Sequence, residues 1–82
     1  MAVNVYPNPV RTGQTISIEA DVDNELLENA VIEVCNLSGI RIEILKVPGQ
    51  ITPVVVRHPA GIYIYILKGK EGFSKEFRVV VI

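Results

Sequence analysis

The sequence predicts an all-β protein, an immunoglobulin-like antiparallel β-sandwich of about seven short strands. Three observations carry this prediction. Apolar and polar residues alternate with a period of two in one segment after another, these segments recur about every ten residues, and prolines and glycines fall between them. No stretch has the length of a crossover helix, which argues against a parallel sheet.

The chain opens with an alternating segment that two prolines end. In "VNVY", Val3 and Val5 alternate with polar neighbours, and Pro7 and Pro9 follow at once. Neither proline can donate a ladder hydrogen bond, and each biases the residue before it toward extended geometry. We therefore expect the strand to stop cleanly, which makes a defined boundary between an upstream linker and a folded sandwich.

Two more strands and one helical turn are expected in the next part of the chain. "TISIEAD" places isoleucine and alanine on one face and serine, glutamate and aspartate on the other. "AVIEVCNL" places Ile32 and Val34 opposite Glu33 and Cys35. Between these strands, residues 24–29 can form a helical turn that is too short to be stable as an isolated helix.

A tight turn should connect the third and fourth strands. "NLSGI" places Asn36, Ser38 and Gly39 where such a turn needs a residue with positive φ. The fourth strand, "IRIEILK", separates isoleucines from charged residues. One face carries Ile40, Ile42 and Ile44, and the other carries Arg41 and Glu43.

Proline and glycine also separate the last three strands. Pro48 and Gly49 suit a type II turn. Pro53 removes a ladder donor, so "ITPVVV" should be an edge strand or carry a bulge. "HPAG" introduces "IYIYILK", which is apolar on both faces and should lie centrally in a sheet. "GKEG" then closes the last hairpin, and "FSKEFRVVV" is the final strand.

Length and composition exclude several classes of protein. A chain of 82 residues is enough for one domain with a single small core. The formal net charge of −1 argues against nucleic-acid binding, which needs a clustered basic surface. No apolar run reaches the length of a spanning helix, and the N-terminus shown lacks the charged-then-apolar layout of a signal peptide. We interpret Met1 and Ala2 as a start added to an excised piece, so the native domain should cover about 3–82 of a larger secreted protein.

No cluster of residues points to catalysis, a cofactor or a metal. Cys35 has no disulfide partner and should be a small half-buried strand residue. His58, the only histidine, has no second ligand at zinc spacing and is expected on an exposed turn. Asp21 and Asp23 offer alternate carboxylates to a cation such as calcium, but the loop lacks the glycine and glutamate of an EF-hand. A solvated turn is preferred there, and the cation stays an alternative. We predict that the protein is not an enzyme and uses no cofactor.

Four elements in register resemble the C-terminal sorting domain of the type IX secretion system, in the type A sorting domain family. The first is "VYPNPV", followed by Gly13 and the strand "TISIE". "VIEVCNLSGIRI" fits the pattern V-x-V-x-N-L-x-G-x-x-V, and "HPAGIYIYIL" fits A-G-I-Y-x-V-x-I. "KEFRVVV" is a short basic-then-apolar last strand. Each element is weak alone, but together they cover essentially the whole chain. Cys35 and Ile40 depart from the usual family pattern.

The resemblance implies a role as an address for export. Such domains are immunoglobulin-like sandwiches at the C-terminal end of cargo proteins of certain Gram-negative bacteria. The implied partners are the outer-membrane translocon, its shuttle protein, a surface sortase that removes the domain, and the covalent N-terminal cargo. The implied localisation is secreted or cell-surface, by way of the periplasm and outer membrane. The alternative is an immunoglobulin-like accessory or adhesion module of a multidomain surface protein, for which the sequence offers no aromatic platform.

The resemblance extends to particular residues in two groups. The first group serves turns, strand ends and the core: Tyr6, Pro7, Asn8, Pro9, Gly13, Asn36, Leu37, Gly39, Gly61, Ile62 and Tyr63. Recognition by the translocon is expected at the last strand, whose backbone a partner strand can join; simple core closure is the alternative role. This second group is Lys75, Phe77, Arg78, Val79, Val80, Val81 and Ile82. Because the edge of Val79–Ile82 is apolar and unprotected in this prediction, the isolated domain should tend to dimerise by edge pairing.

Overall fold

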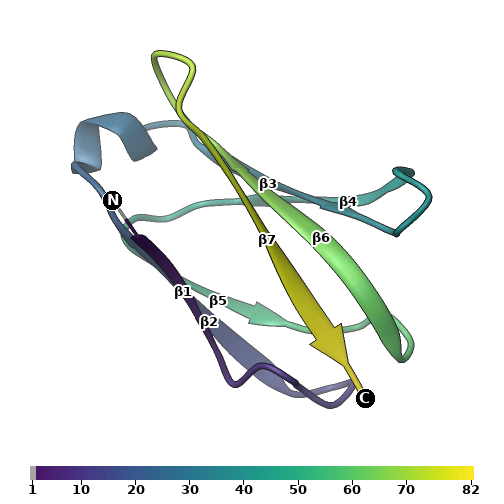
Figure 1. Cartoon of the computed structure of the whole chain (residues 1–82). Helices are drawn as coiled ribbons and strands as arrows, with labels where there is room; N and C mark the ends of the chain where they lie inside the picture. Colours follow the sequence, from purple (N-terminus) through teal and green to yellow (C-terminus); the bar gives the residue numbers. More distant parts are fainter. Residues whose placement is uncertain (1) are drawn as a thin grey trace.

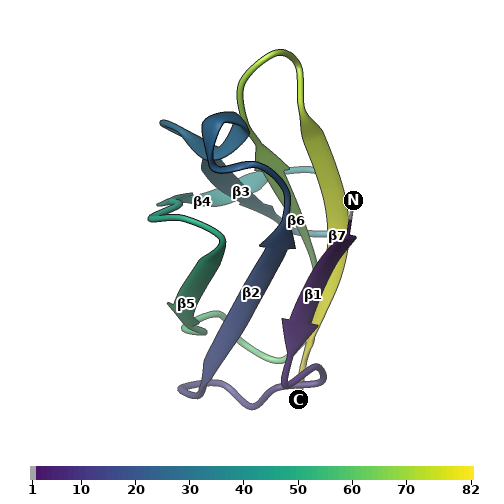
Figure 2. The same cartoon turned by 90° about the vertical axis from the view of Figure 1, so that its left-hand side faces the viewer.

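The computed structural model describes residues 2–82, which form two antiparallel sheets packed face to face (Figures 1 and 2). One sheet has the strand order β1-β2-β5 and the other the order β4-β3-β6-β7. The strands are β1 (Ala2–Tyr6), β2 (Thr15–Asp21), β3 (Val31–Cys35), β4 (Arg41–Lys46), β5 (Ile51–Val55), β6 (Gly61–Lys68) and β7 (Ser74–Val81). The predicted all-β sandwich of about seven short strands is confirmed.

The beginning of the chain is only partly covered by this description. Met1 lies outside the described residues, so the interpretation of Met1 and Ala2 as an added start is not tested. Ala2 belongs to β1 and pairs with Asp21 of β2. Within residues 2–82, no helix has the length and apolar character needed to cross a membrane.

The two sheets meet along two sides of the sandwich. β1 and β7, from different sheets, lie side by side along one of them (Figure 2). β4 and β5, which also belong to different sheets, border the opposite side. In constant-type immunoglobulin domains the fourth strand joins the sheet of the first two strands. Here β4 pairs with β3 instead, which gives one sheet of three strands and one of four.

The core consists of the alternate residues that point between the two sheets. Its fully buried side chains are Val10, Ile16, Ile18, Ile32, Val34, Val56, Tyr65, Leu67 and Val79. The Tyr63 hydroxyl, at the start of β6, donates a hydrogen bond to the Pro59 carbonyl at 2.7 Å. A tyrosine at the start of the sixth strand that bonds back to the preceding backbone is the tyrosine corner of immunoglobulin-like domains. The core and this corner agree with the predicted immunoglobulin-like class.

Several element predictions are confirmed. β5, which contains Pro53, is an edge strand, and β6 lies between β3 and β7. Gly39 has a φ of +84° in the turn between β3 and β4, and Gly72 has a φ of +74° in the last hairpin. The single helical element among residues 2–82 is the 3-10 turn η1 (Asn24–Leu27), inside the expected segment.

Two local predictions are wrong. A type II turn requires a positive φ at its third residue, and Gly49 does not adopt one, so Pro48 and Gly49 do not form that turn. In β4 the isoleucines and the charged residues do not occupy opposite faces as predicted, because Arg41 contacts Glu33 on the outer side of the sheet, where Ile44 pairs with Glu33. Glu43 pairs with the core residue Val34, whereas the isoleucines of this segment are exposed: Ile40, Ile42 and Ile44.

The cause of the second error is a β-bulge. The register between β3 and β4 moves from Val34↔Glu43 to Cys35↔Arg41, so Ile42 is an extra residue on β4. A bulge disturbs the strict alternation of faces and bends the strand that carries it. β4 is also an edge strand, and an edge strand of a small sandwich can place its apolar residues toward solvent.

Candidate functional site

The expected recognition residues of the last strand divide between the two faces of β7. Val79 and Val81 are buried in the core, and Phe77 is half-buried and packs against it. Val80 is half-buried as well, and Lys75, Arg78 and Ile82 are exposed. A partner that reads side chains of the folded strand therefore has no access to Val79 and Val81.

The segment that follows β1 lies against the C-terminal part of β7 (Figure 2). The Asn8 carboxamide donates a hydrogen bond to the Arg78 carbonyl at 2.9 Å and accepts one from the Val80 N–H at 2.9 Å. The Val10 N–H donates to the Val80 carbonyl at 2.9 Å, and the Ile82 N–H donates to the Val10 carbonyl at 2.8 Å. The first sequence motif and the last strand therefore form one continuous surface.

The structure tests two expectations about these two segments. The clean end of the first strand is confirmed, because β1 stops at Tyr6, directly before Pro7. The expectation of an unprotected edge at Val79–Ile82 is wrong, because Asn8 and Val10 already pair with it. Dimerisation by edge pairing stays a prediction, without the open edge on which it depended.

The other motif residues mainly shape turns. The Asn36 side-chain oxygen accepts hydrogen bonds from the N–H groups of Ser38 at 2.9 Å and Ile40 at 3.0 Å. These bonds stabilise the turn before β4. The Gly13 N–H donates to the Val56 carbonyl at 2.7 Å. The Tyr6 hydroxyl donates to the Glu19 carboxylate on the outer face of β1 and β2. The large hydrophobic motif residues that remain exposed are Tyr6, Leu37 and Ile62.

His58 is the residue whose position the sequence prediction missed. It was expected on an exposed turn, and that is wrong, because only 7% of its surface is exposed. Its Nε2 lies 2.7 Å from the Tyr65 hydroxyl, and its ring centroid lies 4.4 Å from that of Tyr63. Burial lowers the pKa of His58 and raises the pKa of Tyr65. The cluster is a buried polar pair within the core and has no access to a substrate.

The outer face of the four-stranded sheet carries a group of aliphatic side chains. Tyr63, Tyr65 and Leu67 of β6 point into the core, so the alternate residues of β6 point outward. Ile62 pairs with Val80 of β7, and Ile66 pairs with Glu33 of β3, which in turn pairs with Ile44 of β4. We call this group the isoleucine face: Ile44, Ile62, Ile64, Ile66 and Val80.

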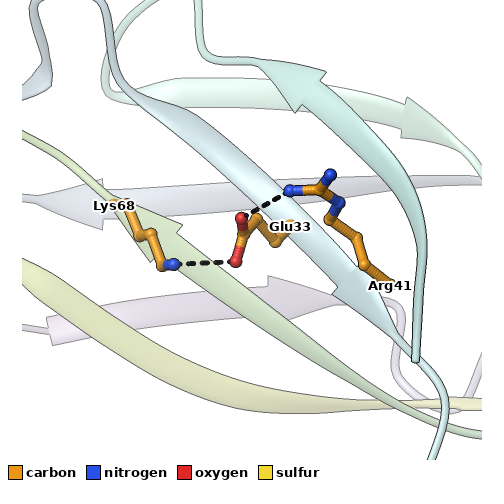
Figure 3. Close-up of polar contacts among 3 residues, drawn as sticks. All are labelled: Glu33, Arg41 and Lys68. Atoms are coloured by element: carbon orange, nitrogen blue, oxygen red, sulfur yellow. Dashed lines mark hydrogen bonds and ion pairs between the residues drawn. The ribbon is translucent and has the colours of Figure 1, made fainter. Parts of the chain in front are cut away.

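Glu33 lies in the middle of the isoleucine face, between two cations from neighbouring strands (Figure 3). Its carboxylate is 2.8 Å from the Lys68 Nζ and 3.2 Å from an Arg41 guanidinium nitrogen. The hydrogen bond from Lys68, and then the one from Arg41, lower the pKa of Glu33. A charged row therefore crosses the isoleucine face, and Glu76 and Arg78 of β7 pair with Ile66 and Ile64 on the same side of the sheet. The sequence alternation puts Glu33 outside, but its two partners become visible only with the strand register.

The remaining polar candidates lie apart from one another. Asp21 and Asp23 are exposed, and among residues 2–82 no three His, Cys, Asp or Glu side chains gather closely enough to hold a metal ion. Cys35 is buried rather than half-buried and pairs with Ile64 on the outer side of the sheet. None of these groups adjoins a second group of the type that nucleophilic or acid–base catalysis uses.

The fold and these surfaces define a class of protein, a small immunoglobulin-like sandwich. The C-terminal part of its last strand is hydrogen-bonded on both edges, and the outer face of its four-stranded sheet carries the isoleucine face. The family model for the secretion system C-terminal sorting domain matches residues 4–82. The chain belongs to this family, the C-terminal sorting domains of the type IX secretion system, and the resemblance seen in the sequence is confirmed. A domain of this family serves as a secretion and sorting signal.

A solved structure agrees on the fold. The chain is similar to PorZ, described as an essential bacterial surface component of the type-IX secretion system of Porphyromonas gingivalis, with a TM-score of 0.73 and 20% identity. The similarity covers 98% of this chain and 11% of PorZ, so it concerns one small domain of a much longer protein. No curated protein matches the chain.

Proposed function

We propose that this domain is the folded address by which the type IX outer-membrane translocon and its shuttle protein recognise a cargo joined to its N-terminus. The observation that carries the proposal is that the family match runs from residue 4 to residue 82, and the two ends of this stretch meet on one surface. A signal of this kind needs the folded arrangement, because Asn8 and Val80 adjoin only after the sandwich has formed.

The part of this surface that a partner reads is the solvent-facing side of β7. Arg78 and Ile82 are exposed there, and Val80 is half-buried beside the isoleucine face. The buried residues Val79 and Val81 contribute by holding the strand in place. This division assigns recognition and stability to alternate residues of the same strand.

Processing by a surface sortase is part of the proposal. In this proposal the sortase supplies the chemistry, and the domain is cleaved from the cargo as its substrate. The cut falls upstream of β1, since a cut inside β1 would remove a strand that pairs with β2 over five residues. The cargo is thereby delivered to the cell surface.

A reporter fusion tests this function. The whole chain is joined behind a signal peptide and a fluorescent protein, in a bacterium that has the type IX system. We expect the reporter outside the cell, and retention in the periplasm would contradict the proposal. The same reporter without the domain is the control. Circular dichroism of the purified fusion verifies that the sandwich is folded, since an unfolded domain would say nothing about recognition.

The isoleucine face favours a second candidate function, an accessory or adhesion module that binds another protein. Exposed aliphatic groups on a flat sheet face are typical of protein contacts. Sugar binding is less favoured, because Tyr6 is the one aromatic residue among 2–82 with a largely exposed side chain. A fusion that reaches the surface without a functional translocon would support this candidate over the first.

A further inference from the structure

The outer edge of β7 is occupied by a segment that imitates a strand. On its other side β7 pairs with β6 over its whole length. On the outer side, the backbone groups of Arg78, Val80 and Ile82 bond to Asn8 and Val10 through four hydrogen bonds of 2.8–2.9 Å. Two of these bonds come from the Asn8 side chain, whose carboxamide has the donor and acceptor of a peptide group. We name residues 8–10 the edge latch.

The edge latch ends the sheet. Pro7 and Pro9 flank Asn8, and neither has an N–H group to offer to a further strand. A sheet edge that carries proline and side-chain bonds is poorly suited to pairing with another chain. In the latched state, the backbone of Arg78–Ile82 is therefore hidden from any partner that would bind by adding a strand.

We infer that the Arg78–Ile82 edge is a strand-acceptor site, held closed by the edge latch, and that a partner protein occupies it with an extended segment once the latch has left. This inference rests on the proposed function and specifies how the last strand is read. Strand addition supplies affinity through main-chain hydrogen bonds and specificity through alternate side chains. The partner takes over the hydrogen bonds that Asn8 and Val10 make now.

The geometry of the latch also defines the direction and the side chain that a partner segment needs in order to replace it. Val10 and Val81 form a parallel bridge, so the incoming segment runs parallel to β7. Val10 is 1% exposed and belongs to the core. The partner must therefore bring an aliphatic side chain of similar size to the position that Val10 vacates. A polar segment would leave that core position unfilled.

The latch is a suitable element to move. It is a short segment, its Asn8 bonds lie at the surface, and Pro9 keeps it outside the β1–β2 ladder. Nearer the hairpin, Ser74 and Glu76 are exposed, and their only strand partner among the described residues is β6. An incoming strand can pair there first and then displace the latch along β7. β7 stays in place meanwhile, because Val79 and Val81 remain in the core.

A disulfide that locks the latch tests the inference. Paired strands lie about 4.8 Å apart, which suits a disulfide between bridge partners. The double variant Val10→Cys, Val81→Cys is placed in the reporter fusion, where the oxidising periplasm forms the bond. We expect about tenfold less export from the oxidised, locked fusion than from the same double variant kept reduced with dithiothreitol. Thermal unfolding of the purified oxidised domain verifies that it is folded.

Asn8→Ala tests the same inference by weakening the latch, because it removes the two side-chain hydrogen bonds to β7. Asn4→Ala is the matched control. Asn4 is exposed on β1 and makes no side-chain hydrogen bond within residues 2–82. We expect the Val80 amide of Asn8→Ala to exchange with solvent about tenfold faster, with export at least as fast as in wild type. The Asn4→Ala domain should match wild type in both measurements.

The outcomes separate the two proposals. Wild-type export from the locked fusion, or loss of export from a folded Asn8→Ala domain, overturns the strand-acceptor site and leaves the sorting function standing. Dimers of Asn8→Ala in light scattering would assign the edge to a second copy of the chain and also overturn it. Failure of the wild-type fusion to leave the periplasm overturns the sorting function itself.

Discussion

The Nε2 of His58 lies 2.7 Å from the Tyr65 hydroxyl, and both residues are buried between the sheets. Burial lowers the pKa of His58 from its ordinary 6.5, and the Glu43 carboxylate opposes this shift to a smaller extent. The folded domain therefore binds the imidazole proton less tightly than the unfolded chain does. By linkage, stability is retained above about pH 6.5 and decreases as the pH falls below it.

We predict that the free energy of unfolding declines between about pH 7.5 and pH 5, as measured by urea denaturation. The variant His58→Gln should be less stable at the higher pH and lose part of this decline, because it has no imidazole to protonate. The difference between the two curves measures the contribution of His58 together with its interaction with Glu43. Parallel curves would show that His58 does not contribute.

The Tyr63 corner gives a prediction about stability alone. Tyr63→Phe removes the 2.7 Å hydrogen bond to the Pro59 carbonyl and keeps the buried ring. A hydrogen bond of this kind contributes about 1 kcal/mol, which lowers the Tm of a domain of this size by about 4–8 °C. Tyr6→Phe is the control, since the Tyr6 hydroxyl bonds to Glu19 at the surface. Equal shifts for the two variants would contradict a special role for the corner.

Two glycines that look alike in the sequence should respond differently to alanine. Gly39 has a φ of +84°, so Gly39→Ala forces an L-residue into the left-handed region and should cost about 1–2 kcal/mol. Gly49 has no positive φ and open space around it, so Gly49→Ala should be neutral or stabilising by up to about 1 kcal/mol. Thermal unfolding of both variants measures the contrast.

The Glu33 cluster predicts a lowered carboxylate pKa, which a titration measures directly. The carboxylate pKa should lie below its ordinary 4.5 in an NMR titration, because Lys68 and Arg41 both bond to the charged form. Lys68→Met should raise this pKa more than Arg41→Met does, since Lys68 is the stronger contributor. By linkage, the cluster stabilises the fold at neutral pH, and this contribution is lost as the pH falls through the lowered pKa. An unshifted Glu33 would mean that the ion pairs do not persist in solution.

Local patterns predicted the strands well, because apolar and polar residues alternate in a strand that has one buried and one exposed face. β2 follows directly from that rule, and the turns at Gly39 and Gly72 follow from the ability of glycine to adopt a positive φ. β4 does not, because the bulge at Ile42 is set by its pairing with β3 and leaves no mark in the chain itself. His58 was misplaced for a related reason. Its neighbour Pro59 signals a turn, but the Tyr63 and Tyr65 rings that bury His58 come from the next strand.

The candidate site was harder to predict because it joins the two ends of the chain. "VYPNPV" was correctly interpreted as a strand end from the chemistry of proline. Its second role depends on Val80, which lies 72 residues from Asn8. No periodicity or turn propensity encodes a contact at that separation. The Glu33 cluster likewise requires the register of three strands before its cations can be assigned.

The last strand separates stability from recognition in neighbouring residues. Val79 is fully buried, so Val79→Ala should cost about 2 kcal/mol through lost burial and a cavity. Arg78 is exposed, so Arg78→Glu should change stability by no more than about 0.5 kcal/mol. If the translocon reads the solvent-facing side of β7, Arg78→Glu reduces export of the reporter fusion although the domain stays folded.

Val79→Ala should behave in the opposite way. Its export should decrease only as far as the domain unfolds, and a lower growth temperature should restore it, because the side chain meets the core and not a partner. Export and circular dichroism are measured on the same fusions. If Arg78→Glu is exported normally while Val79→Ala fails at temperatures where it is folded, recognition depends on an opened strand whose core face becomes accessible. The folded face would then not be the signal.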